Sequence, residues 1–97
     1  MEQQFEHSAE AELHTEKGAK AFRRLCIHFS QKVPATWDDE SGRVEFPESG
    51  ECLFEADDQT LRAHCRAVSP EMLDQLCEVV STHYEKYFHE PLVFAKA

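Results

Sequence analysis

The stretch that decides the fold runs from Ser41 to Val68 and reads SGRVEFPESGECLFEADDQTLRAHCRAV. Apolar and polar side chains alternate over residues 41–46, 50–56 and 61–67, which is the period of a half-buried strand. The segments between them, residues 47–50 and 57–60, are rich in residue types that form turns. The stretch therefore predicts an antiparallel meander with one apolar and one charged face, and the flanking helices must cover the apolar face.

One pairing, Ala56 with Leu61, fixes the register of the last two of these strands. On one face it sets Phe54 opposite Ala63 and Cys52 opposite Cys65. On the other face it sets Leu53 opposite His64, with an ion pair on either side, Glu55 with Arg62 and Glu51 with Arg66, each contributing about 0.2–1 kcal/mol. A slip of one residue would place Phe54 opposite Arg62, which argues for this register. For the preceding strand pair we predict Arg43 opposite Glu55, because this avoids a contact between Glu45 and Glu51.

The segment before the meander predicts a tail, a strand and a helix. We expect residues 1–7 to form a flexible polar tail and residues 8–97 a single domain, because two cores would each be too small. Alternation from Ser8 to Thr15 predicts a strand, although alanine and glutamate favour helix. Thr15 then caps a helix that ends near Gln31 or Lys32. Its apolar stripe consists of Ala19, Phe22, Leu25, Cys26 and Phe29. Residues 35–37 follow as a short strand with Ala35 and Trp37 facing inward.

The segment after the meander predicts a long helix and a last strand. Ser69 and Pro70 are the residue types preferred at an N-cap and at the first helical position. The inner stripe of this helix contains Leu73, Leu76, Cys77, Val80, His83 and Tyr87, with Val79, Tyr84 and Phe88 beside it. Residues 92–95 predict an extra C-terminal strand. The whole order predicts a two-layer α+β domain, with two helices packed on one face of the meander sheet.

The charge of the chain limits its partners. Nineteen acidic and ten basic residues give a net charge of −9, so the summed field repels nucleic acid and anionic membranes. No segment approaches the ~20 apolar residues of a membrane span, and the first residues lack the apolar core of a signal peptide. We therefore expect a cytoplasmic protein, with neither nucleic acid nor membrane as partner. It would be a monomer, or a homodimer joined through a strand edge at residues 92–95.

His83 is the most unusual residue, because it lies within an apolar helical stripe. One interpretation is a core histidine that hydrogen-bonds to a backbone carbonyl or a hydroxyl. The other is a ligand or general base, with Tyr87 nearby, in a pocket between the helices and the sheet. His28 lies at the edge of the first helix's stripe, one turn from Arg24 and from Lys32. If the two helices pack side by side, His28 and His83 approach each other.

The same packing would bring Cys26 and Cys77 toward the histidines. These four residues are weak candidates for a metal site, because their types suit zinc or iron but their spacing contains no close chelating pair. No cofactor is predicted. Cys52 and Cys65 oppose each other across the hairpin, either as reduced core residues or as a redox disulfide. No cysteine lies at a helix N-terminus, which argues against a catalytic thiolate.

The outward face of the sheet is charged. It carries Arg43, Glu45, Glu51, Glu55, Arg62, His64 and Arg66 around Leu53. This face is either a solvated surface or a polar docking surface for a protein, with Leu53 as its apolar centre. Phosphate-binding loops and the HExxH and GxSxG patterns are absent from the sequence, which argues against the common enzyme classes.

Several short motifs resemble the bacterial domain-of-unknown-function family 2218. They are residues 25–29 (LCIHF) with 32–34 (KVP), 41–46 (SGRVEF), 50–52 (GEC) and 79–83 (VVSTH), in an order that covers about residues 11–94. A second histidine follows the HF pair in that family, and Gln31 stands at its place here. The resemblance implies a link to siderophore-interacting and iron-uptake proteins, with no activity attached. It also implies a topology like that of the TATA-binding protein, although the charge excludes DNA binding.

Three functions remain open at this point. The first is a non-enzymatic binding or accessory module, linked by the resemblance to iron or siderophore handling. It would present either the sheet face, with Leu53 and His64, or a helix-lined pocket at His28, His83 and Tyr87. The second is a small enzyme or metal-binding protein that uses His83 and His28. The third is a homodimeric scaffold.

Overall fold

The computed structural model describes residues 5–96. Within them the chain forms two helices and six strands, in the order β1 (His7–His14), α1 (Gly18–Ser30), β2 (Ala35–Trp37), β3 (Ser41–Phe46), β4 (Gly50–Ala56), β5 (Thr60–Ala67), α2 (Pro70–Phe88) and β6 (Ala95–Lys96). The predicted strand, helix, four strands and helix are all present. Of the predicted tail, residues 1–4 lie outside the described residues, and His7 already opens β1.

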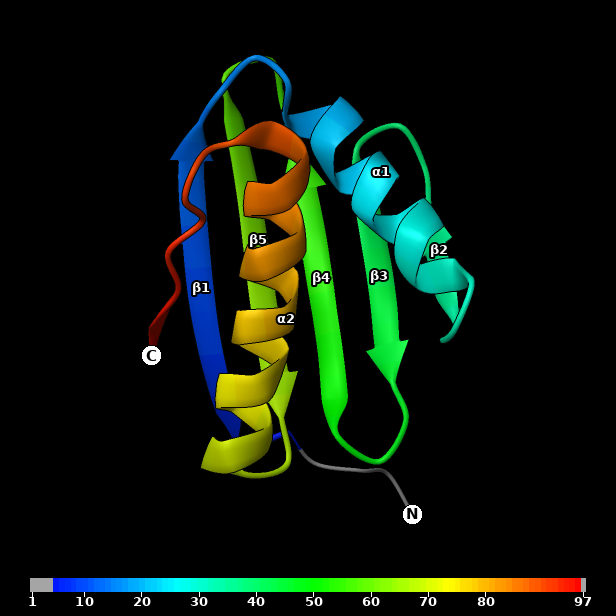
Figure 1. Ribbon diagram of the computed structural model, residues 1–97, viewed down its shortest axis with the longest axis vertical. Coiled ribbons are helices and arrows are strands. Elements are labelled where there is room, and N and C mark those ends of the chain that lie inside the picture. Colours follow the sequence, from blue (N-terminus) through cyan, green and yellow to red (C-terminus); the bar gives the residue numbers. More distant parts are fainter. Residues whose placement is uncertain (1–4, 97) are drawn as a thin grey trace.

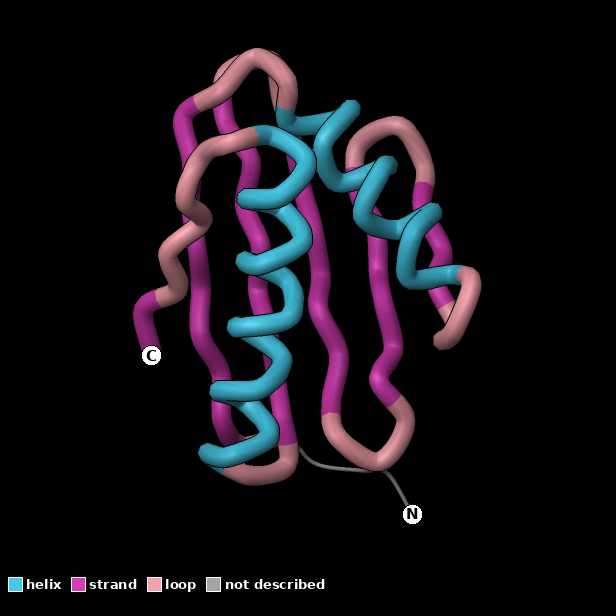
Figure 2. The backbone as a smooth tube through the Cα atoms, viewed as in Figure 1, coloured by secondary structure: helices cyan, strands magenta, loops and turns pink. Residues whose placement is uncertain are grey.

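The strands form one antiparallel sheet in the order β2-β3-β4-β5-β1-β6. Both helices lie on the same face of this sheet, and the other face is bare (Figure 1). The tube in Figure 2 shows that α2 runs along β5 and β4, while α1 crosses toward β2 and β3. The two helices converge at one end of the sheet and diverge toward the other. The predicted two-layer α+β class is confirmed.

The register predicted for β4 and β5 is confirmed at every pair, including Ala56 with Leu61 and Cys52 with Cys65. The register predicted for β3 and β4 is wrong by two residues: Arg43 lies opposite Leu53, and Glu45 lies opposite Glu51. A three-residue turn decides this, because Glu48 adopts a left-handed conformation with φ 69° and brings Phe46 opposite Gly50. Since a shift of two keeps every side chain on its face, the alternation of the sequence could not distinguish the two registers.

The predicted start of the first helix is wrong. The helix begins at Gly18, after an N-cap position at Lys17 whose side chain makes no capping bond. The Thr15 hydroxyl accepts the backbone N–H of Lys17 at 3.1 Å, so it stabilises a turn ahead of the helix. In α2 the prediction is confirmed: Ser69 Oγ accepts the N–H of Met72 at 3.2 Å, and Pro70 opens the helix.

The inner face of α2 is rotated from the predicted one. Its buried residues are Leu73, Leu76, Val80 and Tyr84. His83, Tyr87 and Cys77 are only half-buried, so His83 lies at the margin of the core and not in the middle of its stripe. Tyr84 occupies the centre of the core instead. Its side chain is fully buried, and its hydroxyl donates a hydrogen bond to Glu90 at 3.2 Å.

Two predictions at the sheet edges need correction. Trp37 shares the helix-covered side with Gly42, but it remains 39% exposed because β2 is an edge strand. The C-terminal strand covers Ala95 and Lys96, not residues 92–95, and it pairs with β1. Leu92 is instead buried in the core, so it is not part of an exposed edge. No helix among residues 5–96 is long and apolar enough to cross a membrane.

Candidate functional site

The imidazoles of His28, in the last turn of α1, and His83 of α2 meet across the space between the two helices. Their ring centroids lie 4.5 Å apart, and each ring also packs against Phe29. Phe29 is buried and packs edge-to-face against Phe46 of β3, so it anchors the pair to the sheet. The structure therefore brings together the two histidines that the sequence analysis singled out. We call the group of His28, His83 and Tyr87 the seam cluster.

Hydrogen bonds fix the orientation of both rings. The Nδ1 of His83 lies 2.8 Å from the carbonyl oxygen of Val79, one turn earlier in α2. The Nδ1 of His28 lies 2.9 Å from the hydroxyl of Tyr87. The bond from His83 to a backbone carbonyl is of the kind expected for a structural histidine. Each of the two bonds, however, engages only one nitrogen of its ring. The Nε2 atoms are the positions left for a ligand.

The seam cluster is framed by positive charge. The guanidinium of Arg24 lies 4.4 Å above the centre of the Tyr87 ring. Burial lowers the pKa of His28, and so do the positive charges of His83, Lys32 and Lys86. The charges that lower the pKa of His28 thus come from both helices and the turn after α1, in a chain whose net charge is −9.

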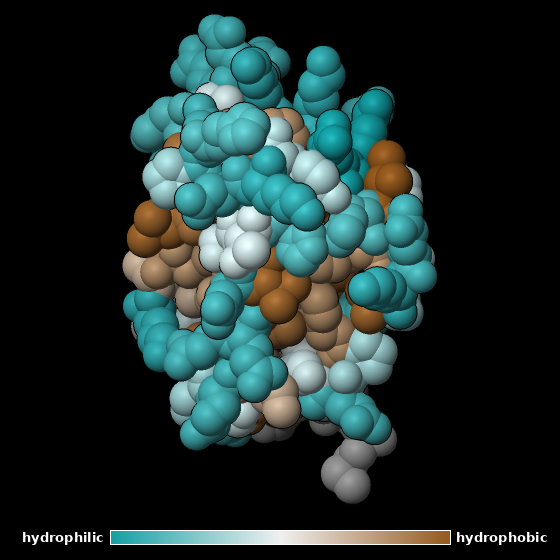
Figure 3. Space-filling view, in the orientation of Figure 1, coloured by the Kyte–Doolittle hydropathy of each residue, from teal (hydrophilic) through white to brown (hydrophobic). Residues whose placement is uncertain are grey.

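This cationic frame was not predicted, although the sequence carries a signal for it. Arg24, His28 and Lys32 follow one another at four-residue spacing, and so do His83 and Tyr87, with Lys86 three residues after His83. Such spacing predicts that each set lies on one side of a helix; in the structure Arg24 and His28 lie on α1, and Lys32 lies in the turn after it. The view of the helical face in Figure 3 shows a mostly hydrophilic surface with a hydrophobic patch between the helices. Val79, 37% exposed, contributes apolar surface beside His83.

Cys26 and Cys77, the other two metal candidates, lie elsewhere. Cys26 is buried beside Gly42 of β3 and Phe22, and Cys77 of α2 faces Cys65 of β5. Within residues 5–96 no three His, Cys, Asp or Glu side chains are placed to hold one metal ion. The two histidines alone would give a cation two nitrogen ligands amid three other positive side chains, which disfavours a divalent ion.

The four cysteines are free. As predicted, Cys52 and Cys65 face each other, and their Sγ atoms lie 3.2 Å apart in the core. Hydrogen bonding to Cys52 and burial raise the pKa of Cys65, and burial raises the pKa of Cys26 to about 11. These thiols are therefore protonated at neutral pH and act as core side chains.

The bare face of the sheet carries three cross-strand rows of side chains. The first holds Ser8, Arg66, Glu51 and Glu45, the second Glu10, His64, Leu53 and Arg43, and the third Glu12, Arg62, Glu55 and Ser41. Leu53 and His64 are half-buried in the middle row, as predicted for the centre of this face. Glu10 and Glu12 were not assigned to this face, because alternation alone does not reveal that β1 pairs with β5.

Ion pairs neutralise much of this face. Glu51 is only 5% exposed and is held by Arg43 at 2.8 Å and by Arg66 at 3.4 Å. Arg43 also reaches Glu45 at 3.4 Å, which explains how Glu45 and Glu51 tolerate their opposed positions. Arg62 pairs with Glu12 at 3.1 Å, not with Glu55 as predicted. Arg43, Arg62 and Arg66 of this face are thus already paired with carboxylates of the same face.

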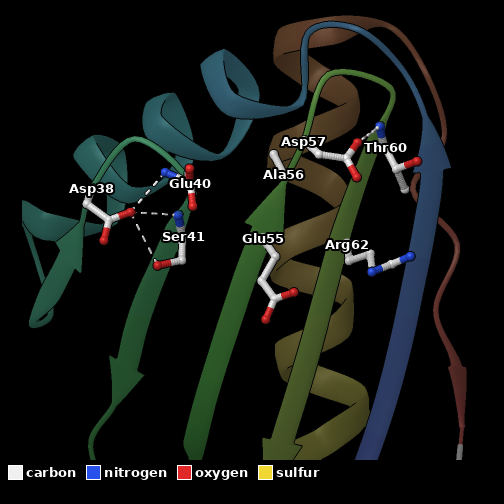
Figure 4. A pocket seen from close by; sticks show the side chains of 8 residues that line it. All are labelled: Asp38, Glu40, Ser41, Glu55, Ala56, Asp57, Thr60 and Arg62. Atoms are coloured by element: carbon white, nitrogen blue, oxygen red, sulfur yellow. Dashed lines mark hydrogen bonds between the residues drawn. The ribbon is translucent and has the colours of Figure 1, made fainter.

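Hollows in this face converge on Glu55. One, of about 330 Å³, is lined by Glu10, Glu12, Leu53, Glu55, Arg62, Ala63 and His64. Another, of about 300 Å³, lies at the start of β3, the end of β4 and the start of β5, where Figure 4 shows Asp38 to one side, next to Ser41, and Asp57 between Glu55 and Arg62. Backbone N–H groups of Glu40 and Ser41 lower the pKa of Asp38, and those of Gln59 and Thr60 lower the pKa of Asp57. The end of the face is therefore anionic.

Comparisons with known proteins establish the family and the fold. The family model described as "Uncharacterized protein conserved in bacteria (DUF2218)" matches residues 10–95. The NMR structure of PA4090 from Pseudomonas aeruginosa is similar, with a TM-score of 0.77 and 21% identity, over 94% of this chain and 95% of that one. No curated protein matches the chain.

Proposed function

Because the chain belongs to the DUF2218 family of uncharacterised bacterial proteins, we propose a function from the site itself: a non-enzymatic binding module whose seam cluster recognises anionic oxygen groups. The carboxylates of an acidic partner segment are the ligand that best fits this surface. The observation that carries the proposal is the convergence of His28, His83 and Tyr87 inside a frame of cations, on a chain that is otherwise acidic.

The shape and chemistry of the seam support a protein segment as ligand. Arg24, Lys32 and Lys86 are exposed cations that act on the cluster, and Val79 supplies exposed apolar surface beside His83. An acidic segment with apolar side chains would match both features, because charged groups at a rim set orientation and buried apolar contacts supply affinity. The sheet face is less suited to this role, since its arginines already bind Glu12, Glu45 and Glu51.

An iron or siderophore context, implied by the resemblance of the sequence, would give the same site a different ligand. Ferric complexes of carboxylate chelators are anionic, and a cationic, aromatic surface attracts them.

A cytoplasmic location belongs to the proposal and is supported by the four free cysteines, since reducing compartments keep thiols reduced.

Binding of defined carboxylate probes tests this function. Hexaglutamate stands for an acidic protein segment, citrate for a small anion, and gallium citrate for a ferric chelate without its paramagnetism. We expect hexaglutamate to bind most tightly and at the seam. If gallium citrate binds much more tightly than citrate or hexaglutamate, the iron context is favoured instead.

A matched pair of variants controls for net charge. Arg24→Gln with Lys32→Gln removes two cations at the seam, and Lys17→Gln with Lys20→Gln removes two exposed cations at the other end of α1. If each seam cation contributes about 0.5 kcal/mol, the first pair weakens binding about fivefold. The second pair should change binding much less. Equal losses in both pairs would mean that only the net charge matters, which would overturn the proposal.

A further inference from the structure

The hydrogen bond between His83 and Val79 determines what His83 can offer a ligand. A carbonyl oxygen only accepts, so the Nδ1 of His83 carries a proton and donates it to Val79 over 2.8 Å. In neutral His83 the Nε2 atom consequently carries a lone pair and no proton, so it repels an anion. Only a second proton, on Nε2, turns this atom into a donor toward a carboxylate.

His28 is a poorer site for that proton. Its Nδ1 is engaged with the Tyr87 hydroxyl at 2.9 Å, and its ring stands against the ring of His83. Burial and the positive charge of His83 both lower the pKa of His28. His83 is the ring whose Nδ1 already has a fixed carbonyl acceptor.

The charged side chains around the pair are cationic. Arg24 comes from α1 and Lys32 from the turn after it, and α2 contributes Lys86 and the hydroxyl of Tyr87. The sheet contributes the uncharged ring of Phe46 through Phe29. These cations oppose protonation of His28, and a bound carboxylate would offset them.

We propose that the seam cluster takes its anionic ligand together with one proton, held on the Nε2 of His83, so that falling pH loads the site and rising pH empties it. The inference depends on the proposed function and adds its regulation. Linkage makes the coupling mutual: the ligand favours the protonated imidazole as much as the proton favours the ligand. No bond other than the one to the proton forms or breaks.

The dissociation constant of hexaglutamate between pH 6.0 and 8.5 tests the coupling. Glutamate side chains have a pKa near 4.3, so the probe itself stays ionised over this range. We expect the dissociation constant to rise by up to about tenfold per pH unit at the alkaline end. Binding that does not change with pH would overturn this inference and leave the proposed function standing. A lack of binding at every pH would overturn both.

Two replacements of His83 sharpen the test. His83→Gln cannot take the proton, so we expect weak binding with no dependence on pH. His83→Arg carries a permanent charge, so binding should persist at pH 8.5. His64→Gln on the opposite face is the matched control and should keep the wild-type profile. Amide spectra of each variant establish that it is folded. A wild-type pH profile in His83→Gln would assign the proton to another group and contradict the inference.

Discussion

The Nδ1 of His28 and the hydroxyl of Tyr87 lie 2.9 Å apart, although 59 residues separate them in the chain. This contact joins α1 to α2 and places one edge of each helix in a common surface. The ring of Tyr87 lies beneath the guanidinium of Arg24, and the ring of His28 lies beside the rings of His83 and Tyr87. The seam cluster is therefore held together by specific contacts, so that the contribution of each residue can be measured by replacing it.

Tyr87→Phe removes the hydroxyl and leaves the ring that supports Arg24. We expect the free energy of unfolding to fall by about 0.5–1.5 kcal/mol, the usual contribution of one such hydrogen bond. Urea unfolding measures this, and the ring nitrogen signals of His28 should move in the NMR spectrum. Unchanged His28 signals would show that the bond does not form in solution.

The lowered pKa of His28 makes stability depend on pH. Between the folded-state pKa and the ordinary value near 6.5, the unfolded chain binds a proton that the folded chain does not. Stability should therefore fall as the pH drops from 6.5 toward the folded-state pKa and stop changing from this cause below it. Urea unfolding from pH 7.5 to 5 should show less of this loss in His28→Gln. The same loss in His28→Gln as in the wild type would contradict the assignment.

Gly50→Ala should be strongly destabilising. A Cβ at this position would overlap the carbonyl oxygen of Arg66 and lie 2.9 Å from the Cδ1 of Leu76. Backbone cannot move aside as a side chain can, so we expect a loss of about 3–5 kcal/mol or a failure to fold. Thermal unfolding measures this, with Ser49→Ala as the neighbouring control. A Gly50→Ala protein as stable as that control would mean that β4 and β5 are not paired as described.

The buried thiols should resist modification in the folded protein. Burial raises the pKa of Cys26 to about 11, and Cys52 and Cys65 are fully buried. Maleimide labelling at pH 7.5, followed by mass spectrometry, should reach the half-buried Cys77 first and the other three only as the chain unfolds. In denaturant all four should react alike. Rapid labelling of Cys52 or Cys65 without denaturant would place them outside the core.

The sequence predicted those parts of the fold in which an error would move side chains to the wrong face. A slip between β4 and β5 would have put Phe54 against Arg62, and that register is confirmed. Between β3 and β4 a two-residue shift moves no side chain across the sheet. The left-handed conformation of Glu48 and the bonds from Arg43 to Glu51 decide that register, and neither follows from alternation.

The candidate site was predicted in part for a similar reason. Helical spacing identified His28 and His83 as unusual, and their approach depended only on α1 and α2 packing side by side. Periodicity locates an apolar stripe but not its exact centre, so Tyr84 took the core position expected for His83. The cations around the pair come from two helices, and their common location becomes visible only once the helices are packed.

The measurement that tests the central claim most directly is an amide chemical-shift titration of the protein with hexaglutamate at pH 6.0. We predict that the largest shifts fall on α1 and α2 around His28, His83 and Tyr87, and that Arg24→Gln with Lys32→Gln reduces them. Shifts that centre on Leu53 and His64 of the bare sheet face, or no saturable shifts at all, would contradict the account.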